Sequence, residues 1–279
     1  MVQPLVFLIW LIMINKPKHL YYVLHSSKEE LEEITKNIDR YYYHFKKAKR
    51  KYGNKQEENG IIRYRDLYPS RGRLKEIQQR INILLQRVKL PEYAYGSVKG
   101  RNNIHNALMH IRNKHFLAVD LKNFFPNITY HQVFRMFRYY NFSPDASHIL
   151  TKLTTYKGSL PQGAPTSPII ANLVFTQTGL LLSKIAANNN ITFTAFLDDL
   201  EFSSKTDFKH LIQEILQEIK SGGFYLHHKK ISYREKKPEV TGLLITDKGL
   251  TVNSIIRKRA KINPFTMHYL KRVEVAAEE

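Results

Sequence analysis

Three aspartates have the chemistry and the spacing to hold divalent metal ions. Asp198 and Asp199 are adjacent in FTAFLDDLEF, between two short runs that alternate as β-strands, and Asp120 follows another strand-like run, FLAV. Mg²⁺ prefers carboxylate and phosphate oxygens, and two such ions can hold the attacking and leaving oxygens of a phosphoryl transfer. These acids therefore favour a nucleotidyl transferase. Because neighbouring side chains of a strand diverge, we expect Asp198 to join Asp120 on both metals. The alternative for the Asp-Asp pair is a polar hairpin turn.

The composition of the 279-residue chain points to a polyanionic partner. It has 44 Lys and Arg against 24 Asp and Glu, a formal net charge of +20. Nucleic acid is the first candidate and an anionic membrane surface the second. The absence of cysteine excludes disulfides, thiolate catalysis and Cys-type zinc sites, and agrees with a reducing, cytoplasmic location. None of the twelve histidines has zinc-ligand spacing, and we interpret His227-His228 as a strand pair with one side exposed.

The start of the chain carries an unbroken apolar run from Leu5 to Ile14. A membrane-spanning helix needs about 20 such residues, and the basic region and cleavage site of a signal peptide are missing. We expect a buried or partner-covered segment, with Met13 as an alternative start, and assign it no function.

Periodicity predicts the elements that must position the acids. Amphipathic helices are expected over roughly 27–50, which begins with capping-box spacing, and over 74–90. Further elements are a strand before Asp120, a helix in HQVFRMFRYY, a long helix from Ser167 to about Ala187, strands in TFTAFL and LEFSS, a helix in DFKHLIQEILQEIKSGG and a strand in FYLHHKKISY. Without the long helix this is the βαββαβ order of a ferredoxin-like sheet, whose first and third strands are central. That order brings Asp120 beside the Asp198-Asp199 hairpin.

Several segments resemble the motifs of reverse transcriptases. AVDLKNFFPNI, GSLPQGAPTSPIIANLVF and FLDDLEFSS resemble motifs A, B and C in order and spacing, and GFYLHHKKI resembles motif D. Upstream, RDLYPSRGRLKEIQ resembles the fingers segment and GSVKGRNNIHNALMH the loop and helix before the palm. The resemblance covers roughly 60–260 and implies an α+β right-hand polymerase fold with fingers, a ferredoxin-like palm and a short thumb. The implied boundaries are 1–60 for an N-terminal helical extension, 61–112 for fingers, 113–245 for a palm with inserted fingers elements, and 246–279 for a short or truncated thumb.

Two short signatures narrow the resemblance to retron-type enzymes. An N-A-x-x-H motif stands at Asn106 to His110, and a V-T-G motif at Val240-Thr241-Gly242. The resemblance implies an RNA-directed DNA polymerase that uses dNTPs to copy a dedicated structured non-coding RNA into single-stranded DNA for antiphage defence. An RNA–DNA hybrid and an effector protein are implied partners, and no membrane is expected. The alternatives are another defence reverse transcriptase, protein-primed or untemplated, and a catalytically silent RNA-binding scaffold of the same fold.

The resemblance also implies roles for single residues in the reaction. Asp120 and Asp198 would hold two Mg²⁺ ions, or Mn²⁺ as an alternative, with Asp199 assisting. Lys230 matches the motif D lysine that protonates the leaving pyrophosphate, and the adjacent Lys229 is the alternative.

Four residues match family positions around the incoming dNTP. Arg65 would touch the triphosphate, a use that suits the forked donors of a guanidinium. Phe125 resembles a steric gate against the ribose 2′-OH, and its alternative role as a core aromatic fits Phe124 better. Gln162 and Gly163 match motif B, where glycine lets the backbone approach the substrate closely.

A further set is expected to bind nucleic acid. Basic side chains would hold the nucleic-acid backbone without reading the base sequence. They are Lys99, Arg101, Arg257, Lys258 and Arg259, and the last three belong to a basic tract that extends to Lys261. The two signatures would recognise the RNA, through Asn106, His110, Val240, Thr241 and Gly242, with a capping or core role as the alternative for His110. Motif C departs from the usual Tyr-Ala of retron enzymes, because Phe196-Leu197 precede the acids. We expect this change to affect fidelity, processivity or substrate choice.

Overall fold

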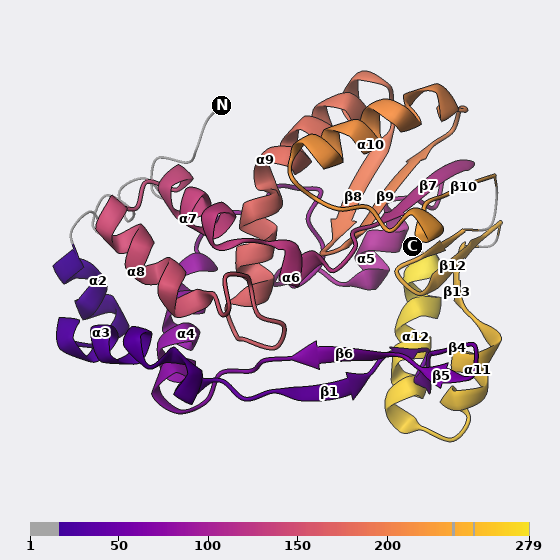
Figure 1. Ribbon diagram of the computed structural model, residues 1–279. Helices are drawn as coiled ribbons and strands as arrows, with labels where there is room; N and C mark the ends of the chain where they lie inside the picture. Colours follow the sequence, from indigo (N-terminus) through magenta and orange to yellow (C-terminus); the bar gives the residue numbers. More distant parts are fainter. Residues whose placement is uncertain (1–16, 236–237, 248, 279) are drawn as a thin grey trace. The chain divides into compact units, whose positions relative to one another are not determined.

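The computed structural model of the protein describes residues 17–235, 238–247 and 249–278 (Figure 1). The expectations for Leu5 to Ile14 and for Met13 lie outside these residues. The chain forms two compact units, each assembled from separated stretches. Among the described residues, the first unit comprises 17–49, 55–90 and 123–174, and the second comprises 50–54, 91–122, 175–235, 238–247 and 249–278.

The first unit is mainly helical. Its helices are α2 (Pro17–Leu24), α3 (Lys28–Lys36), the 3₁₀ helix η1 (Ile38–Tyr41), α4 (Gly72–Leu85), α6 (Phe124–Asn127), α7 (Tyr130–Tyr139) and α8 (Pro144–Thr154). The expected capping box is partly realised at α3, where the Ser27 hydroxyl accepts a hydrogen bond from the Glu30 amide at 3.1 Å. The helix expected over 74–90 is confirmed as α4, which ends earlier, at Leu85. Leu74, Ile77 and Ile81 of α4 are fully buried.

The helix predicted over 27–50 is wrong after Lys36. The chain turns through η1 into the strand β1 (Phe45–Ala48), which pairs antiparallel with β6 (Tyr64–Leu67). The aromatic residues that fit helical spacing also favour strands, and a partner strand decides between the two. The N-terminal segment is therefore not helical throughout. Two short strand pairs follow, β2 (Arg50–Lys51) with β3 (Asn54–Lys55) and β4 (Glu57–Glu58) with β5 (Ile61–Ile62).

The second unit contains the sheet that was expected to carry the acids. Its strands are β7 (His115–Asp120), β8 (Thr192–Phe196), β9 (Asp199–Ser204) and β10 (Ser232–Glu235), in the order β10-β7-β9-β8 with antiparallel neighbours. The first and third strands are central, so the predicted ferredoxin-like order is confirmed. The helix predicted after β9 is present as η2 (Lys209–Leu211) followed by α10 (Ile212–Ser221).

The strand predicted in FYLHHKKISY is only partly correct. A 3₁₀ turn, η3 (His228–Lys230), interrupts it, and β10 begins only at Ser232. The interruption has a local cause, because the His227 amide donates to the carbonyl of Asp120 at 2.9 Å and so closes the chain over the end of β7. The interpretation of His227-His228 as a strand pair is wrong.

The C-terminal part of the second unit has its own core. It contains β11 (Glu239–Val240), β12 (Leu243–Thr246), β13 (Gly249–Val252), α11 (Ser254–Ala260), α12 (Pro264–Glu278) and the earlier helix α5 (Asn103–Leu108). Buried apolar side chains from these elements form one cluster, which includes Ile104, Val240, Leu243, Val252, Leu270 and Val273. The short helix α5 thus depends on partners that follow it by more than a hundred positions.

The long helix α9 (Ser167–Asn188) runs from the first unit into the second and matches its predicted extent. Ser167 is the first residue of the helix, and its hydroxyl donates to the Pro161 carbonyl at 2.5 Å. Within the described residues α9 is long and apolar enough to cross a membrane, but 61% of its apolar stretch is buried. Such burial is what a core helix requires.

Candidate active site

The three aspartates gather at one end of the central strands, and we call them the carboxylate edge (Asp120, Asp198, Asp199). Asp120 and Asp199 are directly opposed across β7 and β9, and directly opposed residues present their side chains on the same face of a sheet. Asp198 occupies the hairpin turn, where its carbonyl accepts a hydrogen bond from the Leu121 amide at 2.8 Å. The fold therefore brings together acids that lie far apart in the sequence.

The carboxylate edge is electrostatically unbalanced. The pKa of Asp199 is raised to about 7, chiefly by burial and then by the negative charges of Asp198 and Asp120, against the opposing effect of Lys230 and Lys51. The Lys230 Nζ lies 2.5 Å from Oδ2 of Asp120, whose side chain is only 13% exposed. An ammonium group thus contacts the acid that lies opposite Asp199 in the sheet.

The same side chains fit divalent metal ions by their chemistry. Across residues 17–235, 238–247 and 249–278, no three His, Asp or Glu side chains are already arranged as a metal site. The carboxylates nevertheless offer the hard oxygen ligands that Mg²⁺ prefers, and their repulsion is the condition that a bound cation relieves. Asp120, Asp198 and Asp199 are therefore the residues that would hold metal.

Alternation along the strands separates two faces of this sheet. Glu201 follows Asp199 by two positions and lies opposite Ala118 and Thr194, on the face of the carboxylate edge. It is 6% exposed, and burial raises its pKa well above the usual value, with further contributions from Asp199 and Glu239. Sequence reasoning missed this buried acid, although its spacing from Asp199 was the available signal.

The turn between β8 and β9, just before Asp198, packs against the segment that precedes α5. Leu197 has a left-handed φ of 59°, and the Tyr95 amide donates to the Ala195 carbonyl at 2.8 Å. A Cβ on Gly96 would meet the Leu197 amide nitrogen at 2.6 Å, so only glycine permits this approach. The supporting segment is fixed by Arg101, whose Nη1 donates to the carbonyls of three of its residues, Pro91, Glu92 and Ala94.

A second polar group lies under the other end of the same hairpin, and we call it the His110 cluster (His110, Asn113, Thr192, Thr194, Ser203). The His110 ring nitrogens lie 2.6 Å from Ser203 Oγ and 2.8 Å from Thr194 Oγ1. Asn113 donates to Ser203 Oγ at 2.7 Å and to Thr192 Oγ1 at 3.2 Å. Burial lowers the pKa of His110 to about 3, so the ring is neutral and can donate from one nitrogen while it accepts at the other.

The two short signatures meet in space. Val240 pairs with Leu243, and the two-residue turn between them has positive φ at Thr241 (45°) and Gly242 (86°). Thr241 Oγ1 donates to the Asn103 carbonyl at 3.3 Å and accepts from Asn106 Nδ2 at 3.4 Å. The N-A-x-x-H and V-T-G motifs therefore fasten α5 to the β11–β12 turn.

This arrangement corrects one expectation about RNA recognition. Asn106, His110 and Val240 are each 0% exposed, so their side chains have no surface to offer to RNA as placed. The alternative of a core histidine describes His110. Thr241 and Gly242 are half-buried in the turn and keep some exposed surface.

The four residues expected around the dNTP all belong to the first unit. Arg65 lies on β6, paired with Lys47 across β1, and its side chain is exposed. The Gln162 carbonyl accepts from the Tyr68 amide at 2.8 Å, just after β6. Gly163 has a φ of 105°, and an added Cβ would lie 3.4 Å from the backbone of Pro69. Phe125 is half-buried at the start of α6.

Phe124, the neighbour of Phe125, is 4% exposed, as the core alternative predicted. The loop of motif B therefore packs against the end of β6 inside the first unit. The dNTP-binding roles of the four residues remain predictions.

The basic residues expected to bind nucleic acid differ in whether their side chains already have partners within the protein. Lys99 and Lys258 are exposed. Arg257 forms an ion pair with Glu274 at 3.7 Å, and Arg259 donates to the Tyr52 carbonyl at 3.3 Å. Arg101 is committed to its own loop, as described above. The lysines are thus the better candidates for phosphate contacts.

Comparison with known proteins shows sequence similarity over much of the chain. A family model described as "Reverse transcriptase (RNA-dependent DNA polymerase)" matches residues 63–245. The retron Se72 reverse transcriptase of Salmonella heidelberg (strain 579083-10) is 29% identical over 255 residues, covering 89% of this chain and 64% of the relative. The retron Ec86 reverse transcriptase of Escherichia coli is 31% identical over 209 residues, covering 72% of this chain and 65% of the relative. The chain thus spans a little less than two thirds of the length of these relatives.

Proposed function

Because the chain belongs to the reverse transcriptase (RNA-dependent DNA polymerase) family, we propose that it synthesises DNA on an RNA template at the carboxylate edge. The observation that carries this proposal is the opposition of Asp120 to Asp199 across β7 and β9, with Asp198 in the adjoining turn. A sheet built for stability alone gains nothing from three acids at one end, because their repulsion disfavours ionisation.

The three acids would hold two Mg²⁺ ions, which supply Lewis-acid stabilisation of the charge that develops on the transferring phosphate. Lys230 sits against Asp120 and carries the proton that the pyrophosphate leaving group requires. Its contact favours Lys230 over Lys229 for this role. Arg65, with Phe125, Gln162 and Gly163, would contact the incoming dNTP.

The similarity to retron enzymes supports a narrower form of the proposal. The template would be a dedicated structured non-coding RNA, the product single-stranded DNA, and the setting antiphage defence in the cytoplasm. The chain would then have fingers, palm and thumb subdomains, with the ferredoxin-like sheet as the palm. The same acids would serve another defence reverse transcriptase equally well, and a silent scaffold would have no need of them.

Primer extension tests the activity. The wild-type protein is expected to incorporate dNTPs on a primed RNA template with Mg²⁺, while Asp198→Asn loses incorporation and keeps its RNA affinity. Glu214→Gln, an exposed acid on α10, is the matched control and should retain activity. Absence of incorporation on every template, with tight RNA binding retained, would establish the scaffold instead. A strong preference for the RNA encoded beside the gene over an unrelated RNA supports the retron form.

A further inference from the structure

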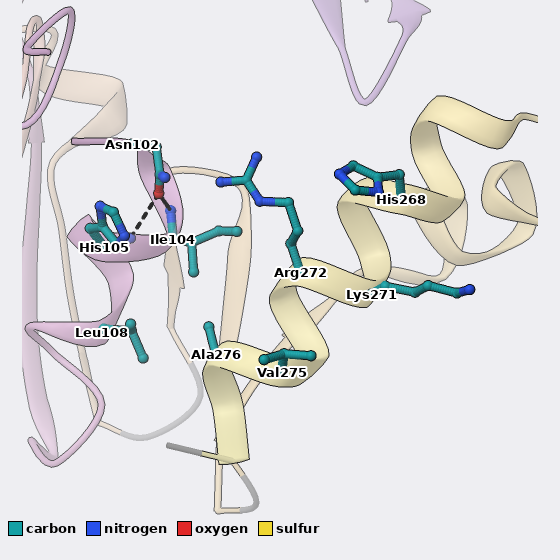
Figure 2. A pocket seen from close by; sticks show the side chains of 9 residues that line it. All are labelled: Asn102, Ile104, His105, Leu108, His268, Lys271, Arg272, Val275 and Ala276. Carbon is teal, nitrogen blue, oxygen red and sulfur yellow. Dashed lines mark hydrogen bonds between the residues drawn. The ribbon is translucent and has the colours of Figure 1, made fainter. Parts of the chain in front are cut away.

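A pocket of about 410 Å³ opens between α5 and α12, within the second unit (Figure 2). α5 contributes Ile104 and Leu108, whose apolar side chains point toward α12, and α12 contributes Arg272, Val275 and Ala276. Pockets of about 300–1,000 Å³ accommodate small organic ligands. This pocket is outside the carboxylate edge, and none of the residues expected to bind nucleic acid lines it.

The charged side chains that the structure places in the lining of the pocket, Arg272 and Lys271, are both basic. Its lining contains Arg272, Lys271, His105 and His268, and none of the described side chains that line it is acidic. Figure 2 shows the guanidinium of Arg272 extending across the opening toward Asn102, while the ammonium end of Lys271 points away. Among the described residues Arg272 forms no ion pair, and the nearby Glu274 of α12 is paired with Arg257. Arg272 is therefore available to an anion that enters this pocket.

The opposite wall is apolar and firmly supported. Ile104 is 4% exposed and belongs to the C-terminal core, and Leu108 packs against that core. On the α12 wall, which also carries Arg272, Val275 is 58% exposed and leaves an apolar surface open to solvent. A ligand that contacts these side chains and Arg272 has an apolar part and an anionic part. A nucleotide has both, as an aromatic base joined to a phosphate.

We propose that this pocket binds one unpaired nucleotide, with its base against Ile104, Leu108 and Val275 and its phosphate on Arg272. The inference rests on the proposed function only in taking single-stranded RNA as the source of the nucleotide. RNA is recognised mainly at unpaired nucleotides, whose bases can leave the stack and enter a pocket. A base inside a continuous duplex enters a pocket only after its stacking and pairing are broken.

The proposed pocket would give the N-A-x-x-H segment a part in RNA binding although Asn106 and His110 are buried. Asn106 turns inward and bonds to Thr241, while Asn103 Nδ2 bonds to the Tyr269 hydroxyl of α12 at 2.7 Å. These contacts fix α5 against β12 and α12. The other side of the same helix then presents Leu108, and beside it His105, to the pocket. The motif holds the helix in place, and the residues between its fixed positions contact the ligand.

Binding measurements on matched variants test the proposal. Affinity would be measured for adenosine monophosphate, a short single-stranded oligoadenylate and a blunt RNA duplex, with wild type, Arg272→Gln, Val275→Glu and Lys271→Gln. Arg272→Gln removes the phosphate partner and Val275→Glu places a negative charge on the exposed wall, so each should weaken single-strand binding about tenfold. Lys271→Gln removes the same charge from the neighbouring position and should change it by less than about twofold.

The outcomes separate the sources and the proposals. Loss of oligoadenylate affinity in Arg272→Gln assigns the pocket to RNA, and loss of adenosine monophosphate affinity alone assigns it to a free nucleotide. Equal weakening by Arg272→Gln and Lys271→Gln, or weakening of duplex binding to the same extent, would show only general charge attraction and overturn the pocket. Primer extension on an unstructured template reports on the proposed function separately, because it depends on the carboxylate edge.

Discussion

The two ends of the β8–β9 hairpin treat buried polar groups in opposite ways. At one end, in the His110 cluster, a neutral ring, the Asn113 amide and three hydroxyl-bearing side chains share hydrogen bonds of 2.6 to 3.2 Å. At the other, the carboxylate edge sets Asp199 against Asp120 and Asp198, and its pKa rises to about 7. The buried side chains of the His110 cluster are thus hydrogen-bonded to one another at the end where no chemistry is expected. At the end where chemistry is proposed, the carboxylates repel one another.

The contrast suggests that one end of the hairpin stabilises the fold while the other end carries the proposed chemistry. Buried polar groups that satisfy one another fix the register of strands, while an unsatisfied group costs stability and persists only where the surroundings hold it. Gly96 and the segment behind Leu197 supply part of that support at the turn. Mutations at the two ends should therefore have opposite effects on stability.

The largest effect is expected from Asp199→Asn at the strained end. DNA synthesis should fall by at least about 10³-fold, because a metal ligand is lost. At pH 8 without metal, the free energy of unfolding should rise by about 1–3 kcal/mol, since a carboxyl group with a raised pKa no longer has to ionise in the folded state. Primer extension and urea denaturation measure the two quantities. A variant that is both inactive and less stable would contradict the contrast.

Removal of the His110 ring should act in the opposite direction. His110→Ala leaves Ser203 and Thr194 hydroxyls without their partner and opens a cavity, so the free energy of unfolding should fall by about 3 kcal/mol. His110→Gln can keep one of the hydrogen bonds and should lose less. Urea denaturation compares the two variants, and activity per folded molecule should survive in His110→Gln better than in Asp199→Asn. Equal stability of the alanine variant and wild type would refute the role of the cluster.

The same histidine predicts a pH dependence of stability. Its folded pKa of about 3 lies below the usual 6.5, so the unfolded chain takes up a proton that the folded chain refuses. Its contribution is complete above pH 6.5 and is lost as the pH falls toward 3, by up to about 1.4 kcal/mol per pH unit. His110→Gln should flatten the curve of unfolding free energy between pH 6.5 and 5 by that slope. An unchanged slope would show that His110 titrates normally in the folded state.

The smallest structural effect is expected at Lys230. Its ion pair with Asp120 is half-exposed on the lysine side, so Lys230→Gln should change the free energy of unfolding by less than about 1 kcal/mol. DNA synthesis should nevertheless fall at least about tenfold, through loss of a proton donor. Lys229→Gln is the matched control on the adjacent residue and should have little effect. If Lys229→Gln slows synthesis more than Lys230→Gln, the roles of the two lysines are exchanged.

Local patterns predicted the hairpin and the strand order. TFTAFL and LEFSS alternate with period two around the acids, and each strand is paired within the hairpin, so neighbouring residues contain most of the information. β1 was predicted as a helix because its strand conformation depends on pairing with β6. The residues of β1 alone do not indicate that a partner strand is present. The turn η3 depends in the same way on the end of β7.

The candidate site was predicted where chemistry leaves few residue types to choose from. Adjacent aspartates beside a strand are rare enough to be noticed, and the fold then joined them to Asp120. The pocket residues could not be found in this way, because Arg272 and His105 are ordinary surface residues until α5 and α12 are brought together. The burial of Asn106 was not predicted, and a core role for His110 was only the alternative, since a motif gives residue types but not the directions of their side chains.

The contacts between α5 and the C-terminal core also affect when this part of the chain can fold during synthesis. The side chain of Asn103 bonds to Thr241, 138 positions later, and to Tyr269, 166 positions later. At ribosomal rates of about 5–20 residues per second, α5 waits roughly 7 to 33 seconds for these partners. A six-residue helix is not stable alone, so this segment leaves the ribosome before it can fold. The second unit therefore completes its folding late, and the newly made chain has time to meet RNA, or a chaperone, before the pocket between α5 and α12 exists.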